Sequence, residues 1–188
     1  MEVRALTPHA LHDVRDLFGT SSVTRGCWCV WFLVRGQAAH DGWGSVNQER
    51  FEHLVSDGAE PAGVLAYDSE GRPVGWCATG PRSRYARVLR SPLTAPTRDA
   101  TEDDAVWFVP CFYVRPASRR AGLTRRLLDA AAAEATRHGA KAIEGFPLAG
   151  PGPHRDDRYL GTEGLFAACG FTEVARPSPR RVVMRREL

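Results

Sequence analysis

The stretch Val106–Leu128 constrains the fold of this 188-residue chain more than any other. Its first part, Val106–Val114, is almost entirely apolar, and the lack of polar alternation predicts a strand that is buried on both faces. Pro116 ends this strand, and Gly122 lies within the arginine-rich turn that follows. Leucine and alanine then recur at helical spacing, which predicts a helix over residues 122–138. The predicted order is strand, turn, helix.

The predicted turn is suited to binding an anion. Backbone N–H groups at the start of a helix have no intrahelical partner, and the helix dipole makes that end partially positive. Gly122 carries no Cβ, so a ligand can approach its backbone closely. The alternative is a solvated basic start of a helix. Four arginines surround the turn, namely Arg119, Arg120, Arg125 and Arg126.

This segment resembles the acetyl-CoA-binding motif of the GCN5-related N-acetyltransferases, the GNAT family. The family motif reads Val-x-Pro-x-x-Arg and continues, from that arginine, as Arg/Gln-x-x-Gly-x-Gly/Ala. The chain has VRPASR at Val114–Arg119 and RRAGLT at Arg119–Thr124. Two residues depart from the pattern. Arg120 stands where a glycine is common, and Thr124 replaces the final Gly/Ala, but neither change removes the backbone donors.

The remaining elements follow the GNAT order across nearly the whole chain, and Gly164–Phe171 resembles the family's Leu-Tyr-x-x-x-Gly-Phe segment. The resemblance implies an α/β fold in one domain over residues 1–188. Its mixed, mostly antiparallel sheet would have helices on both faces and a splayed strand pair. The other predicted elements are a strand at Glu2–Leu6, a helix from Thr7 to Gly19, irregular chain over Gly19–Gly44, a helix from Ser45 to Gly58 opened by a Ser45–Gln48 capping box, a hairpin of Val64–Tyr67 and Pro73–Gly80, a loop over Arg82–Asp104, a strand at Ala142–Phe146, a helix over Tyr159–Cys169, and strands at Phe171–Ala175 and Arg181–Arg186.

The resemblance also implies that the chain binds acetyl-CoA and transfers its acetyl group directly to an amine. The acetyl group would lie where the strands Val106–Val114 and Ala142–Phe146 splay apart. The backbone of one strand would pair with the pantetheine arm, through Phe112, Tyr113 and Val114. The amides that would hold the pyrophosphate belong to Arg119, Arg120, Ala121, Gly122, Leu123, Thr124 and Arg125.

The sequence lacks the acid that many family members use to protonate the leaving thiolate. Many family members use a tyrosine at the position that Phe166 occupies here, and phenylalanine has no hydroxyl. Tyr159 is the nearest phenol and is the candidate acid; otherwise it is a packing or rim residue. Water, or direct departure of the thiolate, is the alternative, because a thiol pKa of about 8.5 makes a tolerable leaving group.

Glu144 is the first candidate for the base that deprotonates the amine, because it is a lone carboxylate inside a predicted strand beside the cleft. The alternative is a glutamate that faces solvent or pairs with an arginine. Asp103 and Asp104 are second candidates, or loop and capping residues. Cys111 lies within the cofactor strand and is a candidate to face the acetyl group, or a small core residue.

The segment CWCVWF at Cys27–Phe32 supplies two aromatic residues, Trp28 and Trp31, which are candidates for the wall of the acceptor pocket. The competing interpretation is a hydrophobic plug against the sheet. A single Cys-x-Cys pair has no second pair at metal-ligand spacing, so no metal site is predicted. His40 and His154 are isolated and are expected at the surface.

Composition excludes several classes of protein. The 25 basic residues are scattered among 22 acidic ones, so no nucleic-acid partner is indicated. The longest apolar runs are too short to span a bilayer, and the N-terminus has no apolar secretory segment. Five cysteines, an odd number, favour free thiols over a disulfide framework. We therefore expect a cytoplasmic protein that does not enter a membrane.

Taken together, the residues and the resemblance predict an N-acetyltransferase whose acceptor is a small-molecule amine, either a metabolite or an antibiotic. A protein lysine or N-terminus is the main variant of the acceptor. A non-catalytic acyl-CoA-binding sensor, favoured by Phe166, and an enzyme with a longer acyl donor stay open. The state of assembly also stays open, with a homodimer as one alternative.

Overall fold

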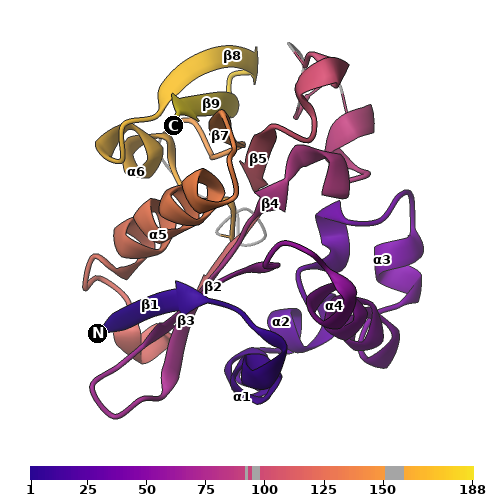
Figure 1. The fold of residues 1–188 in the computed structure, drawn as a ribbon, viewed down its shortest axis with the longest axis vertical. Helices are drawn as coiled ribbons and strands as arrows, with labels where there is room; N and C mark the ends of the chain where they lie inside the picture. The colour runs from indigo at the N-terminus through magenta and orange to yellow at the C-terminus, as the bar shows by residue number, and fades with distance from the viewer. Residues whose placement is uncertain (92, 95–97, 151–158) are drawn as a thin grey trace.

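The computed structural model describes residues 1–91, 93–94, 98–150 and 159–188. Its strands form two sheets that are joined through a long helix, α5 (Figure 1). None of the helices within these described ranges has the length and apolar character that a bilayer crossing requires. In chain order the helices are α1 (Leu11–Gly19), α2 (Ser22–Cys27), α3 (Ala38–Asp41), α4 (Ser45–Asp57), α5 (Leu123–Arg137) and α6 (Glu163–Ala168).

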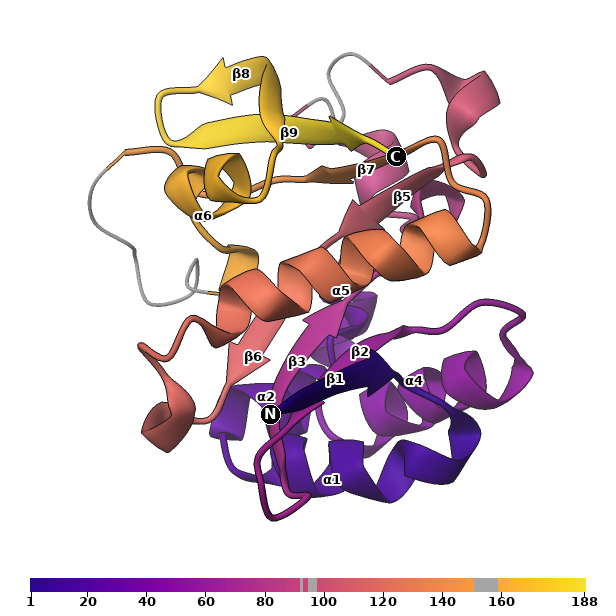
Figure 2. The same cartoon turned by 60° about the vertical axis from the view of Figure 1, so that its left-hand side comes forward.

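The first sheet is antiparallel and carries helices on both faces. Strand alternation places Val64 and Ala66 in the core under α5, and Leu65 and Tyr67 in the core shared with α1 and α4. Figure 2 shows α5 crossing in front of the strands, with α1 and α4 on the other side. The order of this sheet is β1 (Glu2–Ala5), β2 (Gly63–Tyr67), β3 (Pro73–Ala78) and β6 (Phe112–Val114).

The second sheet contains the parallel pair of the fold. Strands β5 and β7 run parallel from Val106 opposite Ala142 to Val109 opposite Gly145, and the other named strand pairs of the described residues are antiparallel. The predicted mixed, mostly antiparallel arrangement is therefore confirmed. The order of this sheet is β4 (Gly80–Pro81), β5 (Val106–Val109), β7 (Ala142–Gly145), β9 (Arg181–Glu187) and β8 (Thr172–Ser178).

The predicted continuous strand Val106–Val114 is wrong in one respect, because it is broken into β5 and β6. Pro110 and Cys111 lie between the two halves, and each half belongs to a different sheet. Proline has no N–H to donate to a ladder, so β5 cannot continue its pairing beyond Val109. The break makes β6 diverge from β7, and the splayed strand pair that the family resemblance implies is confirmed in this form.

Two helix boundaries also differ from prediction. The N-cap of α4 is Gly44, with φ 101°, and no side chain caps this helix, so the Ser45–Gln48 capping box does not form. Helix α6 begins only after Thr162, whose hydroxyl accepts a hydrogen bond from Leu165 N at 3.2 Å. This cap explains why the predicted start of α6 at Tyr159 is wrong.

Two segments that looked irregular contain short helices. The region between Gly19 and Gly44 holds α2, a 3-10 turn at Val30–Phe32, and α3. Ser21 caps α2 by accepting a hydrogen bond from Val23 N at 3.3 Å. The predicted loop over Arg82–Asp104 holds three 3-10 turns among its described residues, and residues 92 and 95–97 lie outside them.

Candidate active site

The outer edge of β6 is open to a ligand. Arg115 N donates to Val74 O at 3.0 Å, which fixes the residues of β6 that face β3. Because an antiparallel ladder alternates, Tyr113 also faces β3, whereas the backbone groups of Phe112 and Val114 point to the outer edge. No other strand of the described residues pairs with this edge. An extended ligand can therefore add to it as a strand would.

The turn after β6 reaches α5 through two residues with left-handed backbone. Arg120 has φ 64° and Gly122 has φ 70°. Glycine, which is common in the family motif at the position of Arg120, adopts this conformation readily. For a residue with a side chain, the left-handed conformation costs about 1–2 kcal/mol of conformational free energy. Gly122 is the N-cap of α5, and within the described residues no side chain caps that end. The N–H groups of the first turn of α5 are thus available to an anion.

A hollow of about 580 Å³ lies between the edge of β6 and this turn, and we call it the cradle. Arg119 Nε donates to Val114 O at 3.1 Å and ties the turn to the strand edge. Ala121, Gly122 and Arg125 are exposed and do not line the hollow itself. The predicted cofactor residues that do line it are Phe112, Tyr113, Val114, Arg119, Arg120, Leu123 and Thr124.

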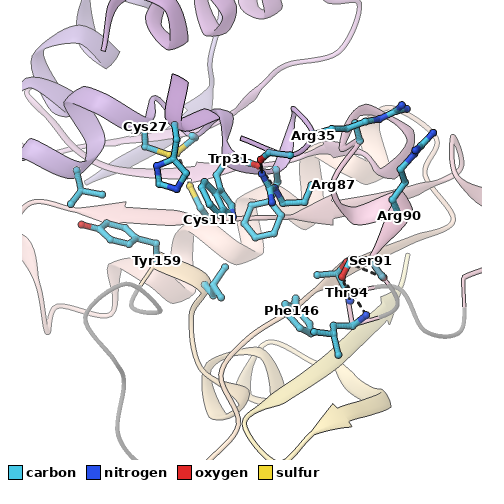
Figure 3. A pocket seen from close by; sticks show the side chains of 18 of the residues that line it. Cys27, Trp31, Arg35, Arg87, Arg90, Ser91, Thr94, Cys111, Phe146 and Tyr159 are labelled. Carbon is cyan, nitrogen blue, oxygen red and sulfur yellow. Dashed lines mark hydrogen bonds between the residues drawn. The ribbon is translucent and has the colours of Figure 1, made fainter. Parts of the chain in front are cut away.

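A larger cavity, of about 1040 Å³, is the candidate acceptor site (Figure 3). One wall comes from α2 and the 3-10 turn Val30–Phe32, and another comes from the chain between Ala86 and Thr94. Phe146, just after β7, and Tyr159 complete the described lining together with a few neighbours. The cavity is therefore assembled from segments that are far apart in the sequence.

The cradle and the cavity meet at Tyr159. Its side chain and that of Val23 line both spaces, and Cys111, in the break between β5 and β6, lines the cavity beside them. The Tyr159 ring stacks on Tyr113, with centroids 6.5 Å apart and planes at 22°. Burial raises the pKa of Tyr159, so its phenol keeps its proton at neutral pH.

Two thiols connect the cavity wall to the broken strand. The Sγ atoms of Cys29 and Cys111 are 2.6 Å apart. The hydrogen bond to Cys111, followed by burial, raises the pKa of Cys29, and burial raises the pKa of Cys27 to about 11. The thiols of Cys27 and Cys29 are thus neutral at pH 7. Over residues 1–91, 93–94, 98–150 and 159–188, no cluster of three or more His, Cys, Asp or Glu side chains could hold a metal ion.

The sequence profile of the Acetyltransferase (GNAT) family matches residues 28–147, which is more than half of the chain. The chain belongs to the GNAT family. Acetyl-CoA is the acetyl donor of this family and therefore the cofactor of the chain. The open edge of β6, the uncapped start of α5 and the arginines of the cradle fit its pantetheine arm and its pyrophosphate. No curated protein matches the chain.

Solved GNAT structures share the fold. An acetyltransferase from Listeria monocytogenes 4b F2365 aligns with a TM-score of 0.60 at 12% identity, over 100% of this chain and 94% of that one. A GCN5-related N-acetyltransferase from Kribbella flavida gives 0.58 at 18%, over 100% and 97%. A phosphinothricin acetyltransferase from Sinorhizobium meliloti, solved with acetyl-CoA, gives 0.53 at 16%, over 100% and 88%. At these identities the likeness is one of fold.

Phe166, at the position of the tyrosine that many GNAT members use, has no part in either hollow. It is fully buried, and its ring packs against Phe171 and Phe112 at centroid distances of 4.9 and 6.1 Å. A Cβ on Gly145 would lie 2.2 Å from this ring, so the glycine at the end of β7 makes room for it. Phe166 thus fills the core between the splayed strands.

Glu144 is held by two arginines. Arg82 Nη1 donates to its carboxylate at 2.9 Å and Arg185 Nη1 at 3.1 Å, and its side chain is 8% exposed. The arginine-paired alternative for Glu144 is therefore the one the structure displays. Glu144 is absent from the described lining of the cavity and of the cradle.

The same network extends to Asp103, which accepts from Arg82 Nε at 2.8 Å and also pairs with Arg98. Burial alone would raise the pKa of Asp103, but the hydrogen bonds from Arg98 and Arg82 outweigh it and hold that pKa below its usual value. Asp104, the other second candidate for the base, is exposed. Neither residue appears in the described lining of the two hollows.

The two tryptophans of the Cys27–Phe32 segment are separated by the fold. Trp28 is buried beside Phe18 and does not line the cavity, as the hydrophobic-plug interpretation states. Trp31 does line the cavity. His40 is exposed, as expected of a surface residue, but it is not isolated, because it lies in the lining with its ring 5.0 Å from that of Trp31. His154 lies outside the described residues.

Trp43, for which the sequence analysis predicts no role, also lines the cavity and stacks on His40 with ring centroids 6.3 Å apart. The signal that could have found it is its spacing from His40, because residues three apart share one side of a helical turn.

Proposed function

We propose that the chain is an acetyl-CoA-dependent N-acetyltransferase that transfers the acetyl group directly to the amine of a small molecule. The observation that carries the proposal is the meeting of the cradle and the cavity at Tyr159 and Val23. A donor laid along β6 and an acceptor in the cavity would then come together beside Cys111, where the strands diverge. Membership of the GNAT family supports the reaction class.

Acetyl-CoA, when bound, supplies an acetyl thioester. The residues of the chain bind and orient it in this proposal. The outward backbone groups of Phe112 and the N–H of Val114 would hydrogen-bond to the pantetheine arm. The N–H groups of Leu123, Thr124 and Arg125 would hold the pyrophosphate. Arg119 and Arg120 add positive charge at the same place.

Tyr159 is our candidate for the acid that protonates the departing thiolate. It lies where the two hollows meet, and burial raises its pKa, which keeps its proton in place at neutral pH. It would thereby take the role that Phe166 cannot perform.

Deprotonation of the amine does not use Glu144 in this proposal, because that carboxylate is committed to Arg82 and Arg185. In this proposal the proton of the amine passes to water.

Turnover of a panel of amines, followed by coenzyme A release and by mass spectrometry of the product, tests the proposal. Tyr159→Phe is expected to lower kcat by about 100-fold or more while changing acetyl-CoA affinity little. Tyr67→Phe is the matched control, because Tyr67 donates to Asp13 and lies outside both hollows. An unchanged kcat in Tyr159→Phe would remove this residue from the mechanism.

A non-catalytic acyl-CoA sensor is the second candidate, favoured by the missing hydroxyl at Phe166. It predicts tight acetyl-CoA binding in calorimetry with no acetylation of any amine. Including peptides with a lysine or a free N-terminus in the panel tests the protein acceptor in the same experiment.

A further inference from the structure

We propose that the amine acceptor carries an anionic group, such as a carboxylate or a phosphonate, at the end of an apolar body remote from the amine. This inference rests on the proposed function, since it concerns the acceptor cavity of that reaction. It follows from the charges of the cavity, from its aromatic surface and from the position of its charged side relative to Tyr159.

The first argument is charge. Arg35, Arg87 and Arg90 line the cavity, and no aspartate or glutamate is present in its described lining. The whole chain has nearly balanced charges, with 25 basic and 22 acidic residues, so the excess of positive charge among the described lining residues is a local property. A water-filled space walled by low-dielectric protein concentrates the field of such charges and attracts anions.

The second argument is the way Arg87 is held. Its Nε donates to Trp31 O at 2.7 Å, its Nη2 donates to Gly36 O at 2.6 Å, and its guanidinium lies 4.2 Å from the centre of a Trp31 ring. These partners are uncharged, so they fix the position of the guanidinium without neutralising it. A fixed, uncompensated arginine is a pre-organised partner for a carboxylate or a phosphonate.

The third argument is the direction of the cavity. Figure 3 shows Arg35 and Arg90 at one side of the cavity and Tyr159 at the opposite side, with Trp31 and Cys111 between them. The described residues offer no carboxylate partner to Arg35 or to Arg90. Because the reaction takes place near Tyr159, an anion held at the arginine side belongs to the far end of the acceptor.

The described lining of the cavity is mostly apolar. It includes Trp31, Phe32, Trp43 and Phe146, and flat aromatic faces suit an aromatic or alkyl body. At the arginine side, Ser91 and Thr94 add hydroxyl groups close to Arg90. Polyamines fit poorly, because their additional ammonium groups would meet Arg35 and Arg90 at this side, and the described lining offers no carboxylate to them.

Matched pairs of amines that differ only in the remote group test this assignment. The first pair is para-(aminomethyl)benzoate and para-(aminomethyl)benzamide, and the second is gamma-aminobutyrate and its amide; spermidine is the cationic comparison. We expect kcat/KM to be about tenfold or more higher for the acid of a pair than for its amide, a difference of about 1.4 kcal/mol. The preference should weaken as salt is added.

The variant Arg35→Gln/Arg90→Gln should abolish this preference, because it raises KM for the acid far more than KM for the amide. Arg25→Gln is the control, because Arg25 is exposed and does not line the cavity. Equal or better turnover of the amides, or a preference for spermidine, overturns the inference but leaves the transferase intact. So does an efficient acceptor outside the pairs that has no anionic group. Acetyl-CoA binding without acetylation of any amine instead defeats the proposed function.

Discussion

Arginines occupy two different settings in this molecule, and the contrast separates structure from binding. In the first, Arg82 and Arg185 face Glu144, while Arg82 and Arg98 face Asp103, in a network whose Arg82 side chain is 2% exposed. In the second, Arg35, Arg87 and Arg90 line the cavity, and no carboxylate is present among the described lining residues. Charges that the chain has already paired hold the fold together. Charges that it leaves uncompensated beside a hollow are available to a ligand.

The largest expected effect tests the paired setting. Glu144→Gln should lower the free energy of unfolding by about 1.5–3 kcal/mol, because it removes the charged acceptor that Arg82 and Arg185 share. Arg82 keeps its pairing with Asp103, and Arg185 keeps its pairing with Glu187. Chemical denaturation measures this loss of stability. Glu187→Gln is the control, since Glu187 pairs with the same Arg185 but its side chain is 71% exposed, and it should cost below about 1 kcal/mol.

The folded fraction of Glu144→Gln should keep the pH–rate profile of the wild-type protein. A profile that loses its acidic limb would return Glu144 to the mechanism as a base and would break the contrast between the two settings.

The next effect is expected in the cradle. Gly122→Val should weaken acetyl-CoA binding by about tenfold, because a β-branched residue is strained at φ 70° and distorts the start of α5. Steric overlap with the protein is not the cause, since no atom lies within 4 Å of the added Cβ. Gly139→Val is the control at the other end of α5, where φ is 73°. It should cost stability alone, and equal loss of affinity in both variants would count against the cradle.

A smaller effect concerns pH. The pKa of Asp103 is lower in the folded chain than its unfolded value of about 3.9, so its contribution to stability is complete above that pH. The contribution is lost as the pH falls through the folded pKa. The difference in unfolding free energy between the wild type and Asp103→Asn should therefore be constant near neutrality and shrink below about pH 4. A difference that does not depend on pH would contradict the paired setting.

The smallest effect is expected for Arg120→Gly, which restores the glycine of the motif. The change relieves the strain at φ 64° but removes a positive charge from the cradle. We expect acetyl-CoA affinity to fall only a few-fold, and the loss to vanish at high salt. Calorimetry at two ionic strengths measures both. Tighter binding would mean that backbone conformation, and not charge, limits the cradle.

The sequence predicted the cradle because its parts are contiguous. A strand, a turn with Gly122 and the start of a helix follow one another, so local spacing carries most of the geometry. The break at Pro110 was missed, because an apolar run does not reveal that its halves join different sheets. The left-handed backbone conformation of Arg120 was also missed, because arginine seldom adopts it.

The acceptor cavity could be predicted far less well. The thiols of Cys29 and Cys111 touch although 82 positions separate them, and Arg82 reaches Glu144 across 62. Such contacts depend on the packing of the whole chain, and spacing along the sequence does not report them. Trp28 and Trp31 illustrate the limit, because they are three residues apart and still face a core and a cavity respectively.

Pro110 lies where the chain passes from β5 in one sheet to β6 in the other. Any other amino acid at this position would have a backbone N–H, which could pair with a neighbouring strand and extend β5. In the proposed reaction, Pro110 would thereby keep the strands apart where donor and acceptor meet, although it belongs to the described lining of neither hollow.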